Sequence, residues 1–375
     1  MVAVVSPDRI RGDIIGLSHR GFGVRDFSLS AARILRRAIA FDGVCVVTMD
    51  PATLLLTGHV IENGLPEQAT PRLAEIEVLE PDFNKFTGLA GATSPSATLS
   101  QATGGHLERS VRHRELRRPR GFADELRAVF TTDSGTWGGI VLMREAGAAF
   151  FTPADATLVA WLSRNLAEGL RRAILLAAVA ADDAKELDAG LLLLADDNSI
   201  EMSSRSARLW LDELRESGAP EEHLPVGIRT VADQARKIAA GGVNGSSVAT
   251  ARLRTRSGRW VLVRGSMIGD GHEARAAVML EAARSPELAP LIAAAYGLTA
   301  RERAVTRLVA QGLPTDAIAG RLHLSPYTVQ DHLKAIFDKV GVGTRGELVA
   351  RLFFEHYAPR LGTGAQLGSN GWFAS

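Results

Sequence analysis

The chain has 375 residues, of which 46% are hydrophobic and 23% charged, a composition typical of folded domains and a length that allows roughly two or three of them. Basic and acidic residues number 43 and 42, so the net charge of +1 neither favours nor excludes a polyanionic partner. The single cysteine, Cys45, excludes a disulfide framework and a cysteine-based zinc site, and its apolar neighbours indicate a buried, inert thiol.

The N-terminal end of the sequence lacks the charged segment and apolar core of a secretory signal. The longest helical apolar stretch, residues 173–181, is far shorter than the roughly 20 residues that span a bilayer. We therefore expect a cytoplasmic protein with no membrane partner. Residues 1–21 show little periodicity and are predicted to form a loose N-terminal arm.

Residues 22–181 are predicted to form one α/β domain. An amphipathic helix over residues 29–39 leads into it, and a longer helix begins at Thr152, where a threonine N-cap is followed by a proline and then an acidic residue. This longer helix is expected to continue to about residue 181. Apolar runs predict strands at 44–49, 54–61, 125–131 and 137–144.

Two segments of this domain are expected at its surface. Residues 90–105 are rich in Gly, Ala, Thr and Ser, which predicts a long flexible loop. Residues 109–120 contain six arginines, and we favour a solvated segment there over one that binds an anion or nucleic acid. Four tryptophans are interpreted as core residues: Trp137, Trp161, Trp210 and Trp260.

Residues 187–283 are predicted to form a second, smaller domain. Two strands flank a turn at 196–198, two helices follow, and three antiparallel strands complete the domain, which is the order of a small sensor fold. The expected strands lie at 190–195, 199–203, 248–256, 260–267 and 274–281, and the expected helices at 207–214 and 231–239.

The C-terminal part is divided into a linker at 284–297, a helical domain at 298–354 and a glycine-rich tail at 355–375. Capping boxes at Thr299-x-x-Glu302 and Thr344-x-x-Glu347 predict the starts of the first and last helices of this domain. The second helix follows Pro314. Ser325 caps the third, with a proline at its first position.

The third helix has an apolar stripe and an opposite polar face. At 100° per residue, the stripe contains Val329, Leu333, Ile336, Phe337 and Val340, and we expect it to be core. The polar face has side chains that reach base edges and phosphates in protein–DNA complexes: Tyr327, Asp331 and Lys334, with Thr328, Gln330 and His332 beside them. Residues 298–354 carry a net charge of +3, so the basic charge is concentrated here.

This domain resembles the LuxR-type helix-turn-helix over about 56 residues without gaps. The residues that carry the resemblance are Leu298-Thr-Ala-Arg-Glu-Arg303, Leu308-Val-Ala-Gln-Gly312, Ile318-Ala319, Leu322, Leu324-Ser325, Thr328-Val329, His332-Leu333, Ile336-Phe337, Lys339, Val342, Arg345 and Glu347-Leu348-Val349. The resemblance implies that the third helix enters the major groove, that the second braces it, and that the fourth pairs across a dimer.

By analogy with the family, Gln330, Asp331 and Lys334 are the candidates for contacts with base edges. The candidates for phosphate contacts are Thr328, His332 and Lys339. Structural alternatives stay open for several of these residues. His332 fits the edge of the core, Thr328 fits the first helical turn, and Lys334 fits a solvated surface; Arg303 and Arg321 fit exposed positions better than contact positions.

Three positions depart from the common family pattern: Pro314 stands where a Ser or Thr often caps the second helix, and Gln330-Asp331 replaces a pair that often begins with lysine. Asp331 repels phosphate but is able to accept a hydrogen bond from a cytosine amino group. The DNA-binding role is therefore carried over from the family, and the base preference is not.

The order of elements over residues 22–181 resembles a GAF domain, and that over residues 187–283 resembles a degenerate PAS domain. Short stretches such as Gly121–Leu126 and Trp137–Leu142 are similar to those of multidomain LuxR-type regulators of actinobacteria. The resulting fold class is multidomain α+β, with GAF-like and PAS-like α/β sensor domains followed by an all-α four-helix LuxR-type helix-turn-helix.

Motifs for chemistry are absent from the sequence. Asp50-Pro51 lies where a receiver domain carries its phospho-acceptor, but the acidic pair and the lysine of that site are missing, so we interpret it as a strand-ending turn. No phosphate-binding loop, zinc-protease motif or nucleophile elbow occurs. His59, His106 and His113 are too scattered to indicate a metal or haem site. We predict no catalytic residue, no cofactor and no metal.

The predicted function is that of a one-component transcription regulator that binds a palindromic operator as a homodimer through the helix-turn-helix. Double-stranded DNA is the expected partner, and the resemblance also admits a small-molecule effector and RNA polymerase. Three alternatives stay open: a sensor whose helix-turn-helix binds protein instead of DNA, a sigma-factor-like protein, and an enzyme, for which the sequence shows no catalytic constellation. The sequence identifies neither the effector nor the operator.

Overall fold

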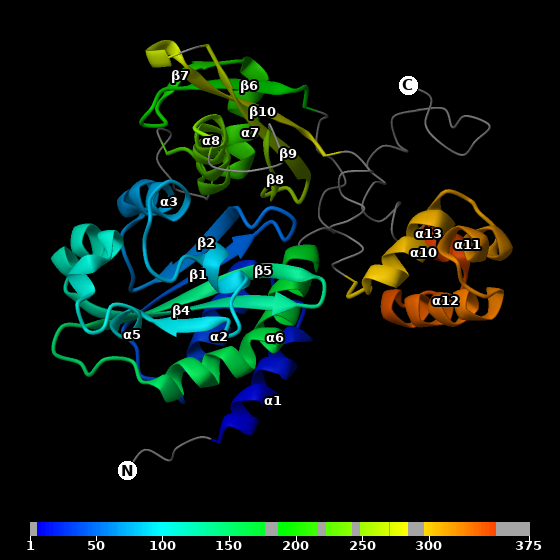
Figure 1. Ribbon diagram of the computed structural model, residues 1–375, viewed down its shortest axis with the longest axis horizontal. Coiled ribbons are helices and arrows are strands. Elements are labelled where there is room, and N and C mark those ends of the chain that lie inside the picture. The colour runs from blue at the N-terminus through cyan, green and yellow to red at the C-terminus, as the bar shows by residue number, and fades with distance from the viewer. Residues whose placement is uncertain are drawn as a thin grey trace. The chain divides into compact units, whose positions relative to one another are not determined.

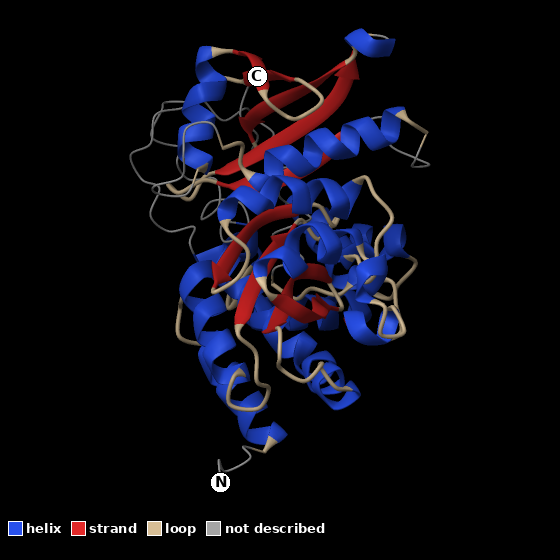
Figure 2. Cartoon of the chain, turned by 90° about the vertical axis from the view of Figure 1, so that its left-hand side faces the viewer, coloured by secondary structure: helices blue, strands red, loops and turns tan. Residues whose placement is uncertain are grey.

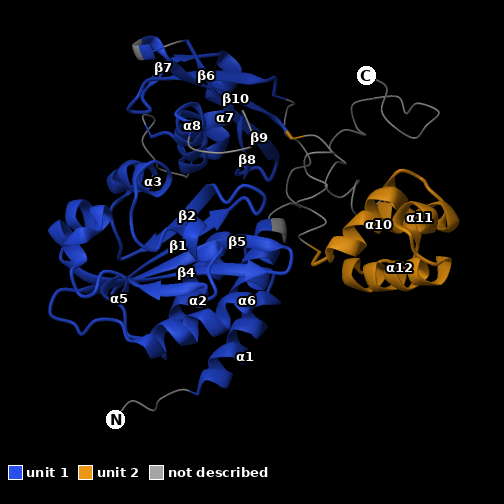
Figure 3. Cartoon of the chain, in the orientation of Figure 1, with its two compact units in different colours: residues 1–177, 187–282 blue, residues 178–186, 283–375 orange. Residues whose placement is uncertain are grey.

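The computed structural model describes residues 6–176, 187–215, 223–241, 248–269, 271–283 and 296–349. The chain divides into two compact units (Figure 3). The first contains residues 1–177 and 187–282, and the second contains residues 178–186 and 283–375. The predicted tail at 355–375, most of the predicted linker at 284–297 and the end of the helix expected to reach residue 181 lie outside the described residues.

The first part of unit 1 is built on a five-stranded antiparallel sheet with the strand order β2-β1-β5-β4-β3 (Figure 1). The apolar runs of the sequence predict four of these strands to within three residues, and β3 was not expected. The strands are β1 (Gly43–Met49), β2 (Leu56–Glu62), β3 (Ser96–Thr98), β4 (Phe122–Thr132) and β5 (Gly135–Glu145).

Helices cover both faces of this sheet (Figure 2). On one face α6 (Pro153–Leu176) packs against β4, and α1 (Pro7–Ser18) and α2 (Val24–Leu35) pack against α6. The other face is covered by α3 (Thr70–Val78) and α4 (Phe86–Ala90). The expected start of α6 is confirmed, because Thr152 and Asp155 exchange capping hydrogen bonds of 3.1 and 2.8 Å.

Two adjacent glycines in β5 explain how both helix layers approach the sheet so closely. A Cβ on Gly138 would lie 2.5 Å from Leu170 of α6, whereas a Cβ on Gly139 would lie 2.7 Å from Phe86 of α4. Successive residues of a strand face opposite sides of the sheet, so each glycine removes one of these clashes. The central strand is therefore held between two closely packed layers.

The second part of unit 1 repeats the same strand order, β7-β6-β10-β9-β8, in another antiparallel sheet. The predicted order of strands and helices is confirmed, although the second helix begins five residues earlier than expected. The strands are β6 (Gly190–Leu194), β7 (Ile200–Ser203), β8 (Ala249–Arg254), β9 (Trp260–Ile268) and β10 (Arg275–Ala282), and the helices are α7 (Arg205–Leu214) and α8 (Val226–Ala239). Trp210 and Val231 are fully buried in the core of this part.

Polar contacts join the two parts of unit 1. Asp50, at the end of β1, is buried; it accepts a hydrogen bond from the backbone N–H of Arg252 at 2.9 Å and pairs with its guanidinium, also at 2.9 Å. Thr230 of α8 donates to the carbonyl of Leu56, and Lys237 of α8 donates to the carbonyl of Val78. Asp50 also accepts a hydrogen bond from the backbone N–H of Ala52, which confirms the strand-ending turn. Its contacts with Arg252, which join the two parts of unit 1, were not indicated by the sequence.

The expectation of a loose arm over residues 1–21 is wrong for residues 7–18. Ser6 caps α1, Pro7 occupies its first position, and Ile10 and Ile14 are fully buried against α6. These apolar side chains recur four residues apart, which is helical spacing, but only three buried aliphatic residues mark the whole helix. A signal of that length is easily missed in the sequence alone.

The expectation of a flexible loop at 90–105 is also wrong. Ser96–Thr98 forms β3 and Leu99–Ala102 forms α5. The small polar residues are buried here, because Asp124 accepts hydrogen bonds from the backbone N–H and hydroxyl of Ser100 at 3.1 and 2.9 Å. The small polar residues that predicted a loop therefore take part in a buried hydrogen-bond network.

The tryptophan prediction is confirmed for Trp137 and Trp210, which are fully buried, and is wrong for Trp161. Trp161 lies on α6 with 42% of its surface exposed. The guanidinium of Arg11 on α1 lies 5.2 Å from the centre of its ring, so a cation–π contact covers it in part. Trp260 is half-buried.

Unit 2 is a bundle of short helices, as expected. They are α10 (Ala300–Ala310), α11 (Thr315–Leu322), α12 (Pro326–Val340) and α13 (Arg345–Val349). The predicted capping box of α10 is complete. In α13, Thr344 caps the backbone N–H of Glu347, but the Glu347 carboxylate accepts from Gly343 instead of Thr344. Residues 350–354, the end of the predicted domain, lie outside the described residues.

Candidate nucleic-acid interface

Helix α12 is fixed at both ends by local sequence signals. The side chain of Ser325 accepts a hydrogen bond from the backbone N–H of Thr328 at 3.1 Å, and Pro326 occupies the first helical position. Gly341 ends the helix in the left-handed conformation with φ of 73°. The ends of this helix are therefore set by its own residues.

The apolar stripe of α12 fixes which side faces the solvent. Val329, Leu333, Ile336 and Val340 are buried against the other helices, as predicted, whereas Phe337 is only half-buried. Because 3.6 residues make one turn, burial of this stripe turns the opposite face outward. That face is therefore presented by a packed bundle and not by a flexible loop.

The exposed face of α12 carries the residues predicted to contact bases. Gln330, Asp331 and Lys334 are all exposed, and Tyr327 has 82% of its surface exposed. Together they offer an amide, a carboxylate, an ammonium and a phenol within the first three turns of one helix. These groups are able to donate to and accept from base edges and phosphates.

Thr328 and His332 lie beside this face and are half-buried. The hydroxyl of Thr328 lies 2.9 Å from that of Ser325, so it already takes part in the first helical turn. This contact supports the alternative that Thr328 serves the first turn of the helix. Both residues remain predicted phosphate contacts.

Lys339 lies apart from the other predicted site residues. It is five residues beyond Lys334 and nine beyond Gln330 on the same helix, which is about 7.5 and 14 Å along the axis. Its ammonium is 2.8 and 2.6 Å from the two carboxylate oxygens of Glu302 on α10. The structure therefore gives Lys339 a partner inside the bundle, which the sequence did not predict.

Glu302 is a junction between two helices. Its carboxylate accepts from the backbone N–H of Thr299 at 2.6 Å, which completes the capping box of α10, and also binds Lys339 of α12. Burial alone raises the pKa of Glu302, but hydrogen bonds from Lys339 and Thr299 outweigh burial and lower the pKa. The capping box was visible in the sequence; its partner 37 residues away was not.

Two arginines, one on α10 and one on α13, form hydrogen bonds with backbone carbonyls elsewhere in the bundle. Arg301 of α10 donates to the carbonyl of Leu322 at 2.8 Å, and Arg345 of α13 donates to the carbonyl of Leu313 at 3.1 Å. These bonds hold the ends of the helices that surround α12.

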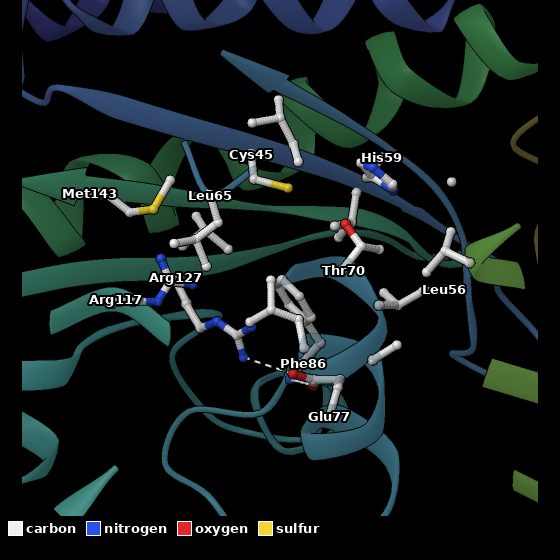
Figure 4. Close-up of a pocket in the computed structure, with 17 residues that line it drawn as sticks. Cys45, Leu56, His59, Leu65, Thr70, Glu77, Phe86, Arg117, Arg127 and Met143 are labelled. Atoms are coloured by element: carbon white, nitrogen blue, oxygen red, sulfur yellow. Dashed lines mark hydrogen bonds and ion pairs between the residues drawn. The ribbon is translucent and has the colours of Figure 1, made fainter. Parts of the chain in front are cut away.

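Unit 1 contains a second candidate site, a pocket on the face of the first sheet that α3 and α4 cover (Figure 4). Carbon atoms line most of it, and Val226, the first residue of α8, contributes to its wall. Arg117 and Arg127 lie together at one end, and His59 lies at the other. His59 is 2.9 Å from the carboxylate of Glu67.

The arginines of the pocket belong to a buried charge cluster. Arg112 contacts Asp82 at 3.1 Å and also binds Glu125, Arg117 contacts Glu125 at 2.7 Å, and Arg127 contacts the carboxylate of Glu77 at 2.9 Å. The expectation of a solvated segment at 109–120 is therefore wrong for Arg112 and Arg117. Both face the sheet because Leu116 between them packs into the core.

The expectation of a solvated segment is confirmed for the four exposed arginines, which are Arg109, Arg114, Arg118 and Arg120.

None of the helices in the described part of the chain has the length and apolar character that a bilayer crossing requires.

Residues 297–352 match the family model for bacterial regulatory proteins of the luxR family. An HTH-type transcriptional regulator of Mycobacterium bovis is 50% identical over 52 residues, which make up 14% of this chain and 6% of that protein. An HTH-type transcriptional regulator of Aeromonas salmonicida is 46% identical over 59 residues, 16% of this chain and 30% of that protein. UhpA of Salmonella typhimurium, a transcriptional regulatory protein, is 41% identical over 71 residues, 18% of this chain and 36% of UhpA.

This chain therefore spans between 6% and 36% of the length of these relatives. The family match lies within the C-terminal segment and agrees with the helices α10 to α13. The C-terminal segment is a LuxR-family helix-turn-helix domain, and the resemblance seen in its residues is confirmed.

Proposed function

We propose that this protein is a transcription regulator that binds DNA through α12. The observation that carries the proposal is the exposed polar face of that helix, held by a buried stripe inside a domain that matches the LuxR family. A helix presented in this way fits the major groove, which is wide enough to admit one. The names of the relatives, all regulators, support the same function.

In this proposal Gln330, Asp331 and Lys334 contact base edges. Thr328 and His332 contact phosphates and set the register of the helix on the duplex. Lys339 acts as a positioning residue, because Glu302 binds its ammonium and the pair joins α10 to α12. A homodimer would place two such helices on a palindromic operator. In this proposal α13 corresponds to the fourth helix, through which the resemblance implies that two protomers pair.

Unit 1 is proposed to be the sensor, composed of a GAF-like part and a PAS-like part. Support comes from the two antiparallel sheets of identical strand order and from the pocket beneath α3. A small-molecule effector bound there would act on the DNA-binding unit, and RNA polymerase would be the downstream partner. The absence of motifs for catalysis in the sequence fits a regulator.

The test is selection of bound duplexes from a random library with the full chain, followed by gel-shift titration of the selected sequence at several salt concentrations. Lys334→Ala is expected to weaken binding to that sequence by about 1–3 kcal/mol, which is about 5- to 150-fold. Arg33→Ala is the matched control, because Arg33 is an exposed cation on α2 that bonds only to Leu29 and Ser30 of its own helix in the contacts described. An unchanged affinity for Lys334→Ala would remove the base-contact assignment.

An alternative function is a protein-interaction module built on the same helix. Asp331 favours it, because an exposed carboxylate in the middle of the polar face repels phosphate. The same titration separates the two functions. Binding to duplex DNA that weakens steeply with salt supports DNA recognition, and the lack of salt-dependent binding to any duplex supports the alternative.

A further inference from the structure

Arg117 is a buried arginine whose hydrogen bonds are incomplete. It ends the π-helical turn His113–Arg117, and only 3% of its side chain is exposed. Its Nε forms an ion pair with a carboxylate oxygen of Glu125 at 2.7 Å, but neither Nε nor Nη1 has a hydrogen-bond partner among the described residues. A buried donor without an acceptor is rare in native proteins, so it points to a partner such as an ordered water or a ligand.

The acidic groups near Arg117 are already engaged. Glu125 accepts two hydrogen bonds from Arg112 and lies 3.8 Å from Arg127, whereas Glu77 is bound to Arg127. Around Glu125, one carboxylate therefore faces three guanidinium groups. Burial, together with the charges of Arg127 and Arg112, lowers the pKa of Arg117 to about 10 against the opposing effect of Glu125. Asp82, Glu125 and Glu77 balance the charges of the three arginines, so the feature that points to an additional acceptor is the unpartnered Nη1 of Arg117.

The pocket beside Arg117 is small and mostly apolar, and its other polar lining residues are Arg127, Glu77, His59 and Thr70. Its volume is about 60 Å³. One water-sized molecule needs at least about 10–15 Å³ on this scale, so the pocket admits only a small molecule. Val47, Leu65 and Val141 form part of its apolar wall. Burial raises the pKa of the Cys45 thiol, which also lines the pocket, to about 11, so the thiol is uncharged at neutral pH.

We propose that this pocket binds a small aliphatic monocarboxylate, whose carboxylate accepts hydrogen bonds from Arg117 and whose alkyl group lies against Val47 and Val141. The site is separate from the polar face of α12. It rests on the proposed function only in that the bound acid would be the effector of the sensor unit.

Other ligand classes fit this pocket less well. Arg117 and Arg127 repel an amine, and a nucleotide is far larger than the available volume. A purely apolar molecule would leave Nη1 of Arg117 without an acceptor, which removes the gain from filling the space. An inorganic anion would pair with Arg117 but leave the apolar wall uncovered. A short-chain acid satisfies both parts of the pocket.

The test uses the full chain and three probes, propionate, butyrate and isobutyrate, in calorimetric titrations and thermal-shift measurements at neutral pH. Isobutyramide is the matched uncharged probe, because it has nearly the shape of isobutyrate. At least one carboxylate is expected to bind saturably and to raise the melting temperature, with isobutyrate about tenfold tighter than the amide, because a charge-assisted hydrogen bond is stronger than a neutral one. Equal binding of isobutyrate and isobutyramide, or no saturable binding of any carboxylate, overturns the proposal.

Arg117→Gln is expected to abolish the preference for carboxylate over amide. Arg118→Gln is the control, because Arg118 is exposed in the same segment, and it should keep the preference. The comparison of acid with amide on the unaltered protein decides the proposal even if Arg117→Gln does not fold. DNA binding is measured separately, so loss of duplex binding would reject the proposed function and leave the carboxylate site standing, and the reverse result would reject only the site.

Discussion

Glu125 in unit 1 and Asp331 in unit 2 show that the two units use a carboxylate in opposite ways. Glu125 is fully buried and faces Arg112, Arg117 and Arg127. Asp331 is exposed on α12. A charge that leaves water is tolerated only when it is paired, whereas an exposed charge keeps its hydration and remains available to a partner. Buried charge therefore lines the pocket of unit 1, whereas in unit 2 the charge of Asp331 lies on the exposed polar face of α12.

The largest effect is expected from Glu125→Gln, which keeps the size of the side chain and removes its charge. Three buried guanidinium groups would lose their shared carboxylate, and breaking a buried pair in this way costs about 3–5 kcal/mol. Because the chain has more than one unit, the change is best measured locally, by hydrogen exchange of the amides of β4 in the full chain. Exchange of the helices of unit 2 should stay unchanged.

Asp331→Asn is the matched control, since the same chemical change at an exposed position is expected to alter stability by no more than about 0.5 kcal/mol. If Glu125→Gln lowered stability as little as Asp331→Asn, the buried cluster would not stabilise unit 1. The contrast between the buried and the exposed carboxylate would then be wrong. Burial by itself raises the pKa of Glu125, but the three arginines outweigh burial and hold that pKa well below its usual range. The stabilisation is therefore present above the pKa of the unfolded chain and is lost only as pH falls through the lowered value.

The same contrast explains which features the sequence predicts well. The helices of unit 2 follow from local signals: a cap such as Ser325 and its proline, a stop such as Gly341, and an apolar stripe all lie within one helix. Each signal acts over a few residues, so it can be seen without knowing the fold. The exposed face of α12 was predictable for this reason.

The pocket of unit 1 was not predictable, because its contacts join distant segments. Arg127 meets Glu77 across 50 residues and Arg112 meets Glu125 across 13. An arginine-rich segment is usually exposed, and nothing in its composition shows which arginines turn inward. Asp124 likewise orders the segment around Ser100 from 24 residues away. Burial of polar groups depends on partners that only the tertiary structure supplies.

Lys339→Met tests an ion pair between an exposed and a buried side chain, because 36% of the Lys339 side chain but only 6% of the Glu302 side chain is exposed. Loss of this charged hydrogen bond is expected to cost about 1–2 kcal/mol once solvent screening of the lysine is allowed for. Faster exchange of α10 amides measures the loss. Since the pKa of Glu302 is lowered in the folded state, the stabilisation is present above its unfolded value and is lost as pH falls through the lowered one.

The salt dependence of DNA binding distinguishes the two roles of Lys339. A phosphate contact would reduce the slope of log affinity against log salt by about one, whereas a positioning residue leaves that slope unchanged. We expect the slope to stay unchanged in Lys339→Met. A reduced slope with normal exchange of α10 would instead identify Lys339 as a phosphate contact, and its bond to Glu302 would then be secondary.

The smallest effect is expected from Asp331→Asn on binding to duplexes of unrelated sequence. Removing one exposed negative charge from the face proposed to meet the phosphates should strengthen this binding by less than about 1 kcal/mol, and by less still at high salt. Fluorescence anisotropy with a random duplex at two salt concentrations measures the gain. On the selected operator the same variant should lose discrimination at one base pair, because asparagine no longer favours the cytosine amino group as a carboxylate does. Unchanged binding to both duplexes would mean that Asp331 does not face DNA, and the exposed carboxylate would then belong to a surface for protein partners.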